Sequence, residues 1–215
     1  MDITQIDFFI TQLGYYFNAI LIPVATAIIG RKLVKEKKVK GAYNPIRALI
    51  FGIFLSFSVL GIIEFFLAVP PFELSLLQEW FGEGIESFDI YGFIIGTMVT
   101  LGLTMIFYAN RWEPLYYSAM FVYVGMFIFY LLTGFDAWLE TYIMITGAIG
   151  VVFLYFTGFR VKDNGALGLA IFFTIAFGTI LIEDHMVTQI SILIYSVFIL
   201  IFSLGYFKPF KEVRA

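Results

Sequence analysis

Glu64 is the side chain whose type and position most clearly suggest chemistry. It lies in the run Gly61-Ile62-Ile63-Glu64-Phe65-Phe66, with apolar residues on both sides. A carboxyl in such a setting can take up a proton or a cation, or anchor a polar ligand. In the opposite interpretation the side chain reaches the nearby surface, or stays protonated and hydrogen-bonds a Tyr or Thr. Glu64 is therefore a candidate ligand or ion site, with both interpretations open.

Asn18 is the second polar candidate, in the apolar stretch 8–30 with Pro23 five residues further on. Proline removes one backbone hydrogen bond, so a kink is expected near Asn18. An amide beside a kink can line a cavity. The simpler expectation is that Asn18 hydrogen-bonds across to another helix, while Pro23 only shapes the packing.

Most classes of enzyme site are excluded by residue type. The chain has no Cys and a single His, His185, which excludes disulfides, thiolate ligands and clusters of His ligands. No GxSxG, HExxH or Walker sequence is present, and no pair of acids lies within one apolar stretch. We therefore expect no catalytic residues, no bound metal and no enzymatic activity.

The segments that must position these residues are apolar along most of the chain. Hydrophobic residues make up 61% of the 215 residues and charged residues 13%, and the mean hydropathy is +0.94. A helix needs roughly 20 apolar residues to cross a bilayer. The sequence thus predicts an all-α integral membrane protein with one domain, 1–215, of seven transmembrane helices and no soluble domain. The predicted spans are 8–30, 48–69, 90–110, 115–135, 141–159, 165–182 and 186–207.

Charge fixes the expected orientation of these spans. All thirteen Lys and Arg residues fall in segments 31–47, 110–114, 160–162 and 208–214, which alternate with the other connections. The opposite side carries eleven acids and no base: Asp2, Asp7, Glu73, Glu79, Glu83, Glu86, Asp89, Asp136, Glu140, Glu183 and Asp184. Basic segments stay in the cytoplasm. We expect a multi-pass protein of the cell membrane, with its N-terminus outside and its C-terminus cytoplasmic.

Two further patterns concern packing and lipid contact. Gly92 and Gly96, followed by Thr100 and Thr104, place small residues at four-residue spacing, which predicts a close helix crossing. The predicted inner loop, residues 31–47, holds four lysines that could contact anionic lipid headgroups. These are Lys35, Lys37, Lys38 and Lys40.

The outer segment 70–89 is acidic but spaces apolar residues at three- and four-residue intervals. The apolar residues are Leu74, Leu77, Trp80 and Phe81. This pattern predicts a short helix at the outer interface with its glutamates in water. The alternative is that these acids form a vestibule that concentrates cations.

The partners expected from the sequence are the lipid bilayer and, beyond it, a membrane protein or a second copy of the chain, with no nucleic acid. A retinal Schiff base is excluded, because no predicted span contains a Lys, and no other cofactor is expected. The scarcity of polar residues in the spans favours a non-catalytic sensor, receptor-like protein or assembly subunit. A small transporter or ion channel, with Glu64 as its proton or cation site, is the alternative.

Overall fold

The computed structural model describes residues 3–81, 89–134, 137–162, 164–180 and 185–205. Helices account for 89% of these residues and none of them lies in a strand, so the all-α prediction is confirmed for this part of the chain. The α-helices are α1 (Ile3–Lys40), α2 (Pro45–Ala68), α3 (Ser75–Phe81), α4 (Asp89–Ala109), α5 (Ser118–Thr133), α6 (Ala137–Val161), α7 (Asn164–Ile180) and α8 (His185–Leu204).

The first helix corrects the prediction of a basic loop over residues 31–47. α1 runs without interruption through Pro23 and continues to Lys40. Lys and Glu are good helix formers, so this polar segment extends the helix beyond its apolar part. Gly41, with φ +76°, ends α1, and the side chain of Asn44 accepts a hydrogen bond from the Arg47 N–H to cap α2. The true connection is therefore a short turn.

The start of the predicted span 115–135 also differs from the structure. Arg111 adopts a left-handed conformation, with φ +56°, and residues Glu113–Leu115 form a 3₁₀ turn. The α-helix itself begins only at Ser118. The short helix predicted in segment 70–89 is present as α3.

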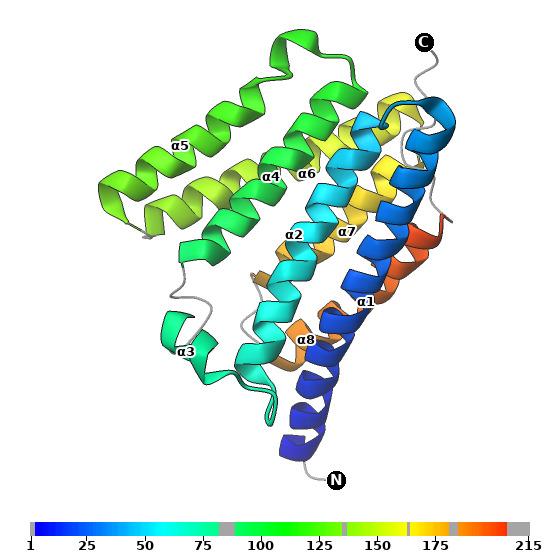
Figure 1. Cartoon of the computed structure of the whole chain (residues 1–215). Helices are drawn as coiled ribbons and strands as arrows, with labels where there is room; N and C mark the ends of the chain where they lie inside the picture. Colours follow the sequence, from blue (N-terminus) through cyan, green and yellow to red (C-terminus); the bar gives the residue numbers. More distant parts are fainter. Residues whose placement is uncertain (1–2, 82–88, 135–136, 163, 181–184, 206–215) are drawn as a thin grey trace.

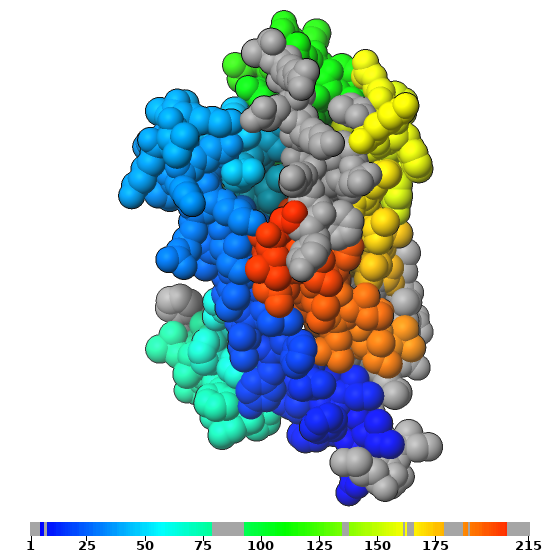
Figure 2. All heavy atoms as spheres, turned by 90° about the vertical axis from the view of Figure 1, so that its right-hand side faces the viewer, coloured from blue at the N-terminus to red at the C-terminus, as the bar shows by residue number. Residues whose placement is uncertain are grey.

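Six of the long helices form a closed ring. In order around it, α1 contacts α2, α2 contacts α4, α4 contacts α6, α6 contacts α7, α7 contacts α8, and α8 returns to α1. Figure 2 shows α1 and α8, the first and last helices, side by side on one face. α5 lies outside the ring, against α4 and α6 (Figure 1).

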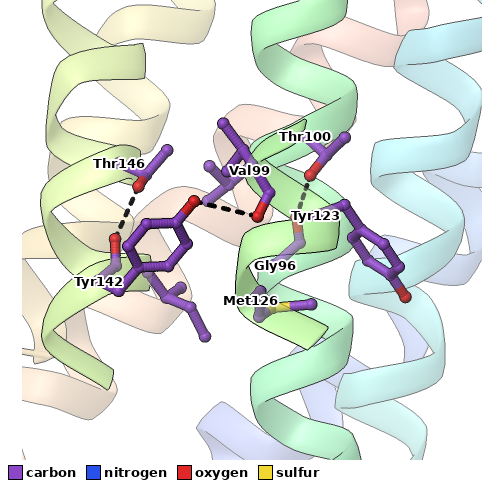
Figure 3. Close-up of a pocket in the computed structure, with 9 residues that line it drawn as sticks. Gly96, Val99, Thr100, Tyr123, Met126, Tyr142 and Thr146 are labelled. Carbon is purple, nitrogen blue, oxygen red and sulfur yellow. Dashed lines mark hydrogen bonds between the residues drawn. The ribbon is translucent and has the colours of Figure 1, made fainter. Parts of the chain in front are cut away.

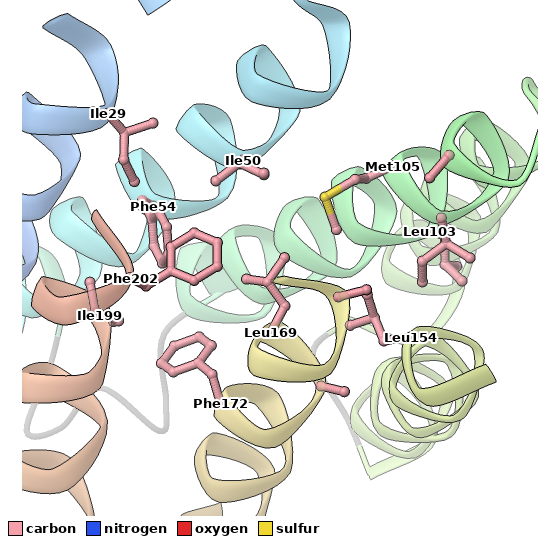
Figure 4. Close-up of a cluster of buried hydrophobic side chains, with 14 of the residues drawn as sticks. Ile29, Ile50, Phe54, Leu103, Met105, Leu154, Leu169, Phe172, Ile199 and Phe202 are labelled. Atoms are coloured by element: carbon pink, nitrogen blue, oxygen red, sulfur yellow. The ribbon is translucent and has the colours of Figure 1, made fainter. Parts of the chain in front are cut away.

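Apolar side chains fill the centre of the ring (Figure 4). Each of the six ring helices contributes buried residues to this one cluster. Aromatic rings from three helices meet edge-on there, because Phe54 of α2 lies 6.3 Å from Phe172 of α7 and 5.8 Å from Phe202 of α8, between ring centroids. The ring thus encloses packed side chains.

Among the described residues, four helical segments are long and apolar enough to cross a membrane: Phe8–Lys40, Pro45–Ala68, Glu113–Thr133 and Trp138–Arg160. In the described parts of α4, α7 and α8, shorter apolar helices cover Phe93–Ala109, Ala166–Gly178 and Ile190–Leu204. The structure therefore fits a membrane protein, and α1 and α2, which carry Asn18 and Glu64, are both among the four long segments.

Candidate functional site

Asn18 and Glu64 lie together in the structure, on neighbouring helices. The side-chain Nδ2 of Asn18 in α1 donates a hydrogen bond of 3.1 Å to Oε2 of Glu64 in α2. Asn18 is 5% exposed and Glu64 is half-buried. The two polar residues that the sequence singles out within apolar stretches thus form one pair.

The surroundings of this pair are close-packed and contain one unpaired oxygen. A Cβ atom added to Gly61 would lie 3.1 Å from the Asn18 amide, so the absence of a side chain there gives the amide room. Tyr15 of α1 is near enough to Glu64 to interact with it electrostatically. The other amide atom, Asn18 Oδ1, is buried and has no hydrogen-bond partner. A buried acceptor without a donor is costly, which marks this atom as unusual.

A second polar contact joins the same two helices further along. Thr26 Oγ1 of α1 lies 2.7 Å from Ser58 Oγ of α2 and donates to the carbonyls of Ile22 and Phe54 at 2.8 and 3.0 Å, as alternatives for its single proton. Ser58 can also donate to the Phe54 carbonyl, at 2.8 Å. The two hydroxyl groups therefore find hydrogen-bond partners within α1 and α2, and no ligand is needed to supply one.

The polar contacts between α1 and α2 do not form a continuous path along the pair. Beyond Thr26, Gly30 of α1 is covered by the Phe51 ring of α2, whose Cε2 would lie 2.9 Å from an added Cβ atom. Beyond this aromatic contact, Glu36 accepts a 2.6 Å hydrogen bond from Arg47 and lies 3.4 Å from the Lys40 Nζ. An apolar contact therefore separates the Asn18–Glu64 pair from the charged end.

The four lysines predicted to contact lipid headgroups lie on the last turns of α1. All four are exposed. The ammonium of Lys37 lies 4.2 Å from the centre of the Tyr43 ring, and Lys40 pairs with Glu36. Lys35 and Lys38 complete the set on the helix surface. Their contact with lipid stays a prediction.

Gly96 lies where α4 meets α5. A Cβ atom at Gly96 would overlap the thioether of Met126, a buried residue of α5. Gly92 lies in the first turns of α4, and its side-chain surroundings fall outside the described residues. Next to Gly96, a small pocket lies between α4, α5 and α6 (Figure 3). It offers roughly the space of one water molecule, too little for an organic ligand.

Tyr142 of α6 borders this pocket and ties α6 to α5. Its hydroxyl donates to the Val122 carbonyl at 3.2 Å, and a Cβ atom at Gly125 would lie 2.7 Å from the same hydroxyl. The contact explains how α5 is held outside the ring. It does not bring acids, bases or nucleophiles together.

Further polar contacts that were not predicted from the sequence lie near the helix ends. Asn110, directly after α4, donates to Thr157 of α6 at 2.7 Å and accepts from Arg160 at 3.4 Å. Lys32 of α1 donates to the Ser203 carbonyl near the end of α8 at 2.6 Å. The only signal for them is a polar residue near a span end, which is common to most spans.

No metal cluster is found among the described residues, where no three His, Cys, Asp or Glu side chains come together. The Asn18–Glu64 pair is the site with the clearest chemical potential, since it combines a carboxyl, a buried amide and an unpaired oxygen. No family model matches the chain, and no curated protein or solved structure matches it.

Proposed function

We propose that seven helices of this protein cross the cell membrane, with the N-terminus outside and the C-terminus in the cytoplasm. Successive long helices run in alternating directions, so the turns after α1, α4 and α6 lie at one end of the molecule (Figure 1). The Lys and Arg residues lie in these turns or on the helix ends beside them, while the sequence of the other connections contains acids and no Lys or Arg. Basic residues remain on the cytoplasmic side.

Exposed apolar side chains support the same placement. They occur along α1, α2, α5, α6 and α8, and Phe121 and Leu132 of α5 are 75% and 77% exposed. A water-soluble protein rarely exposes so extensive an apolar surface. Lipid acyl chains would cover it at no cost.

Within this membrane protein, we propose a non-catalytic role as a sensor, a receptor-like protein or an assembly subunit. One observation carries the proposal, namely that the centre of the helix ring is packed with apolar side chains. Phe54, Met105, Ile106, Phe172 and Ile199 are all 1% exposed or less. Hydrophilic transport needs a path lined by polar groups, whereas this central cluster of the described residues is apolar.

A flux assay tests this role. The purified protein, reconstituted in proteoliposomes, should give no flux of Na⁺, K⁺ or Cl⁻ and no collapse of a pH gradient above that of empty liposomes. Flux that scales with the amount of protein would refute a non-transporting role.

A small transporter or channel is the second candidate, and the Asn18–Glu64 contact favours it. A half-buried carboxyl between two spans is a common element of ion pathways. In that case, flux should be present in the wild type and lost in Glu64→Gln, with the fold retained.

A further inference from the structure

We propose that Asn18 and Glu64 form a binding site for one small monovalent cation between α1 and α2. The inference deepens the proposed function and rests on it, since it names the ligand class that a non-transporting sensor would bind. Three observations carry it: the uncompensated carboxyl of Glu64, the unpaired oxygen of Asn18, and the acidic end of the molecule nearest to them.

The first observation is that no Lys or Arg in the described part of the chain pairs with Glu64. Its hydrogen-bond donor is the neutral amide of Asn18. No Lys or Arg occurs between Met1 and Gly30, or in α2 after Arg47. A carboxylate among apolar helices has to be neutralised or paired. One bound monovalent cation neutralises the single negative charge of this carboxylate.

The second observation is the orphaned oxygen of Asn18. Its Oδ1 atom is buried and accepts no hydrogen bond, although the amide nitrogen beside it is bonded to Glu64. A half-turn of the amide would bring Oδ1 to the position of Nδ2, 3.1 Å from Glu64 Oε2. A proton or small ion held there would lie between two oxygens. A Cβ atom at Gly61 would lie 3.1 Å from Nδ2 and 3.4 Å from Oδ1 of Asn18, so the missing side chain keeps the space beside both amide atoms free.

The charge and number of ligands favour a monovalent over a divalent ion. Ca²⁺ takes six to eight oxygen ligands, commonly from several carboxylates. The structure pairs Glu64 with one amide, and no group of three acidic or His side chains exists among the described residues.

Other titratable groups around Glu64 are few. On α1, Tyr15 interacts with it electrostatically. On α4, the stretch Phe93–Phe107 contains no titratable residue. Glu73, before α3, is exposed to solvent. On α8, which packs against α1, the titratable residues are His185 and Tyr195, and the comparison with Glu64→Gln separates their response from that of Glu64.

The third observation concerns how cations would reach the site. Glu64 lies one turn before the end of α2, and the sequence between α2 and α4 contains Glu73, Glu79, Glu83 and Glu86 but no Lys or Arg. A surface of one charge sign raises the local concentration of the opposite ion. The acids thus attract cations toward the half-buried carboxyl.

Thermal unfolding of the full chain in detergent tests the proposal. Na⁺ is titrated against choline at constant ionic strength and pH, and in a second series pH is lowered without Na⁺. We compare the wild type with Glu64→Gln, with Asn18→Leu, and with Glu73→Gln as a control that removes an exposed acid. At a hundred times its Kd, a bound cation should raise the Tm of the wild type by about 5–10 °C.

A rise with Na⁺ identifies a metal cation as the occupant, and a rise only at falling pH identifies a proton. In either case the rise should be absent in Glu64→Gln, reduced in Asn18→Leu and unchanged in Glu73→Gln. Equal shifts in the wild type and Glu64→Gln in both series would overturn the proposal.

Infrared difference spectra give a second readout if Glu64→Gln does not fold. In the wild type, the carboxyl C=O band should change on addition of Na⁺ or on a change of pH, and Glu64→Asp should shift that band. An identical difference spectrum for the wild type and Glu64→Asp would also refute the site. Binding measured in detergent does not depend on transport, because the solution has no compartments. If the protein binds the cation and also gives flux in proteoliposomes, the binding site is supported and the non-transporting role is refuted.

Discussion

At the scale of single residues, a few hydroxyl and amide groups join α1 to α2. Thr26 is buried, and its Oγ1 reaches both the Ser58 hydroxyl and the Phe54 carbonyl across the helix boundary. Interhelical hydrogen bonds in membrane proteins average about 0.6 kcal/mol and reach about 1.7 kcal/mol. Such contacts give an apolar helix pair its specific register.

Replacing Thr26 by Val should destabilise the protein by about 1 kcal/mol, because the shape is kept while the interhelical hydrogen bonds are lost. Thermal unfolding in detergent measures the loss. Thr104→Val is the matched control, since Thr104 donates to the Thr100 carbonyl of its own helix. Equal losses in the two variants would show that the contact between α1 and α2 adds nothing.

The sequence identified Glu64 and Asn18 separately but could not pair them. Asn18 lies ten residues from the outer end of its predicted span, and Glu64 lies five residues from the outer end of its own. The sequence therefore predicts different depths in the membrane for the two side chains. In the structure α1 begins at Ile3 and extends past the end of α2, which brings the two side chains level (Figure 1). The hydropathy pattern does not show how far one helix extends beyond its neighbour.

At the scale of elements, the contact between α4 and α5 depends on a missing side chain. Gly96→Leu should destabilise the fold by about 1–3 kcal/mol, because the new side chain would have to displace Met126 from its buried position. The detergent melting temperature measures this effect. An unchanged melting temperature would mean that α5 moves away from α4 without cost.

Gly102→Ala on the same helix is the control for that substitution. Apart from the nearby backbone of α4 itself, no atom lies within 4 Å of a Cβ atom built there. Alanine is also the better helix former, so stability should stay the same or rise. A loss as large as that of Gly96→Leu would point to a general intolerance of α4 to side chains.

Helix positions were the most predictable feature at this scale. The predicted span 48–69 differs from α2, Pro45–Ala68, by three residues at its start and one at its end. The agreement is close because Pro45 and the Pro70-Pro71 pair bound the apolar run. The continuation of α1 to Lys40 was missed, because hydropathy reports only the part of a helix that suits lipid.

At the scale of the whole molecule, the closed ring depends on its aromatic centre. Phe172 of α7 lies within 6.5 Å, centroid to centroid, of rings from α2, α7 and α8. Phe172→Ala should cost about 3 kcal/mol, the lower end of the range for buried Phe, because lipid replaces water as the surrounding solvent. Unfolding in detergent measures it.

Phe159→Ala is the comparison for Phe172, since Phe159 of α6 is 71% exposed while Phe172 is 1% exposed. Its effect should stay within about 0.5 kcal/mol. Similar losses in both variants would contradict a packed centre.

The order of helices around the ring could not be predicted from the sequence. Helices that are apolar on all sides carry no polar stripe to show which face is inside, so nothing in the pattern places α8 against α1 or α5 outside the ring. Side-chain shape decides these contacts, as at Gly96 and Met126.

Labelling of single cysteines tests the proposed arrangement of the chain across the membrane. The chain has no Cys, so each variant carries one reactive thiol. The variants are Glu73→Cys and Glu140→Cys on the proposed outer side, and Lys38→Cys, Arg111→Cys and Lys162→Cys on the inner side; all five residues are exposed. A membrane-impermeant maleimide applied to intact cells should label the first two and should label the other three only after lysis. Labelling of Lys38→Cys, Arg111→Cys or Lys162→Cys in intact cells would contradict the seven-span arrangement with its N-terminus outside.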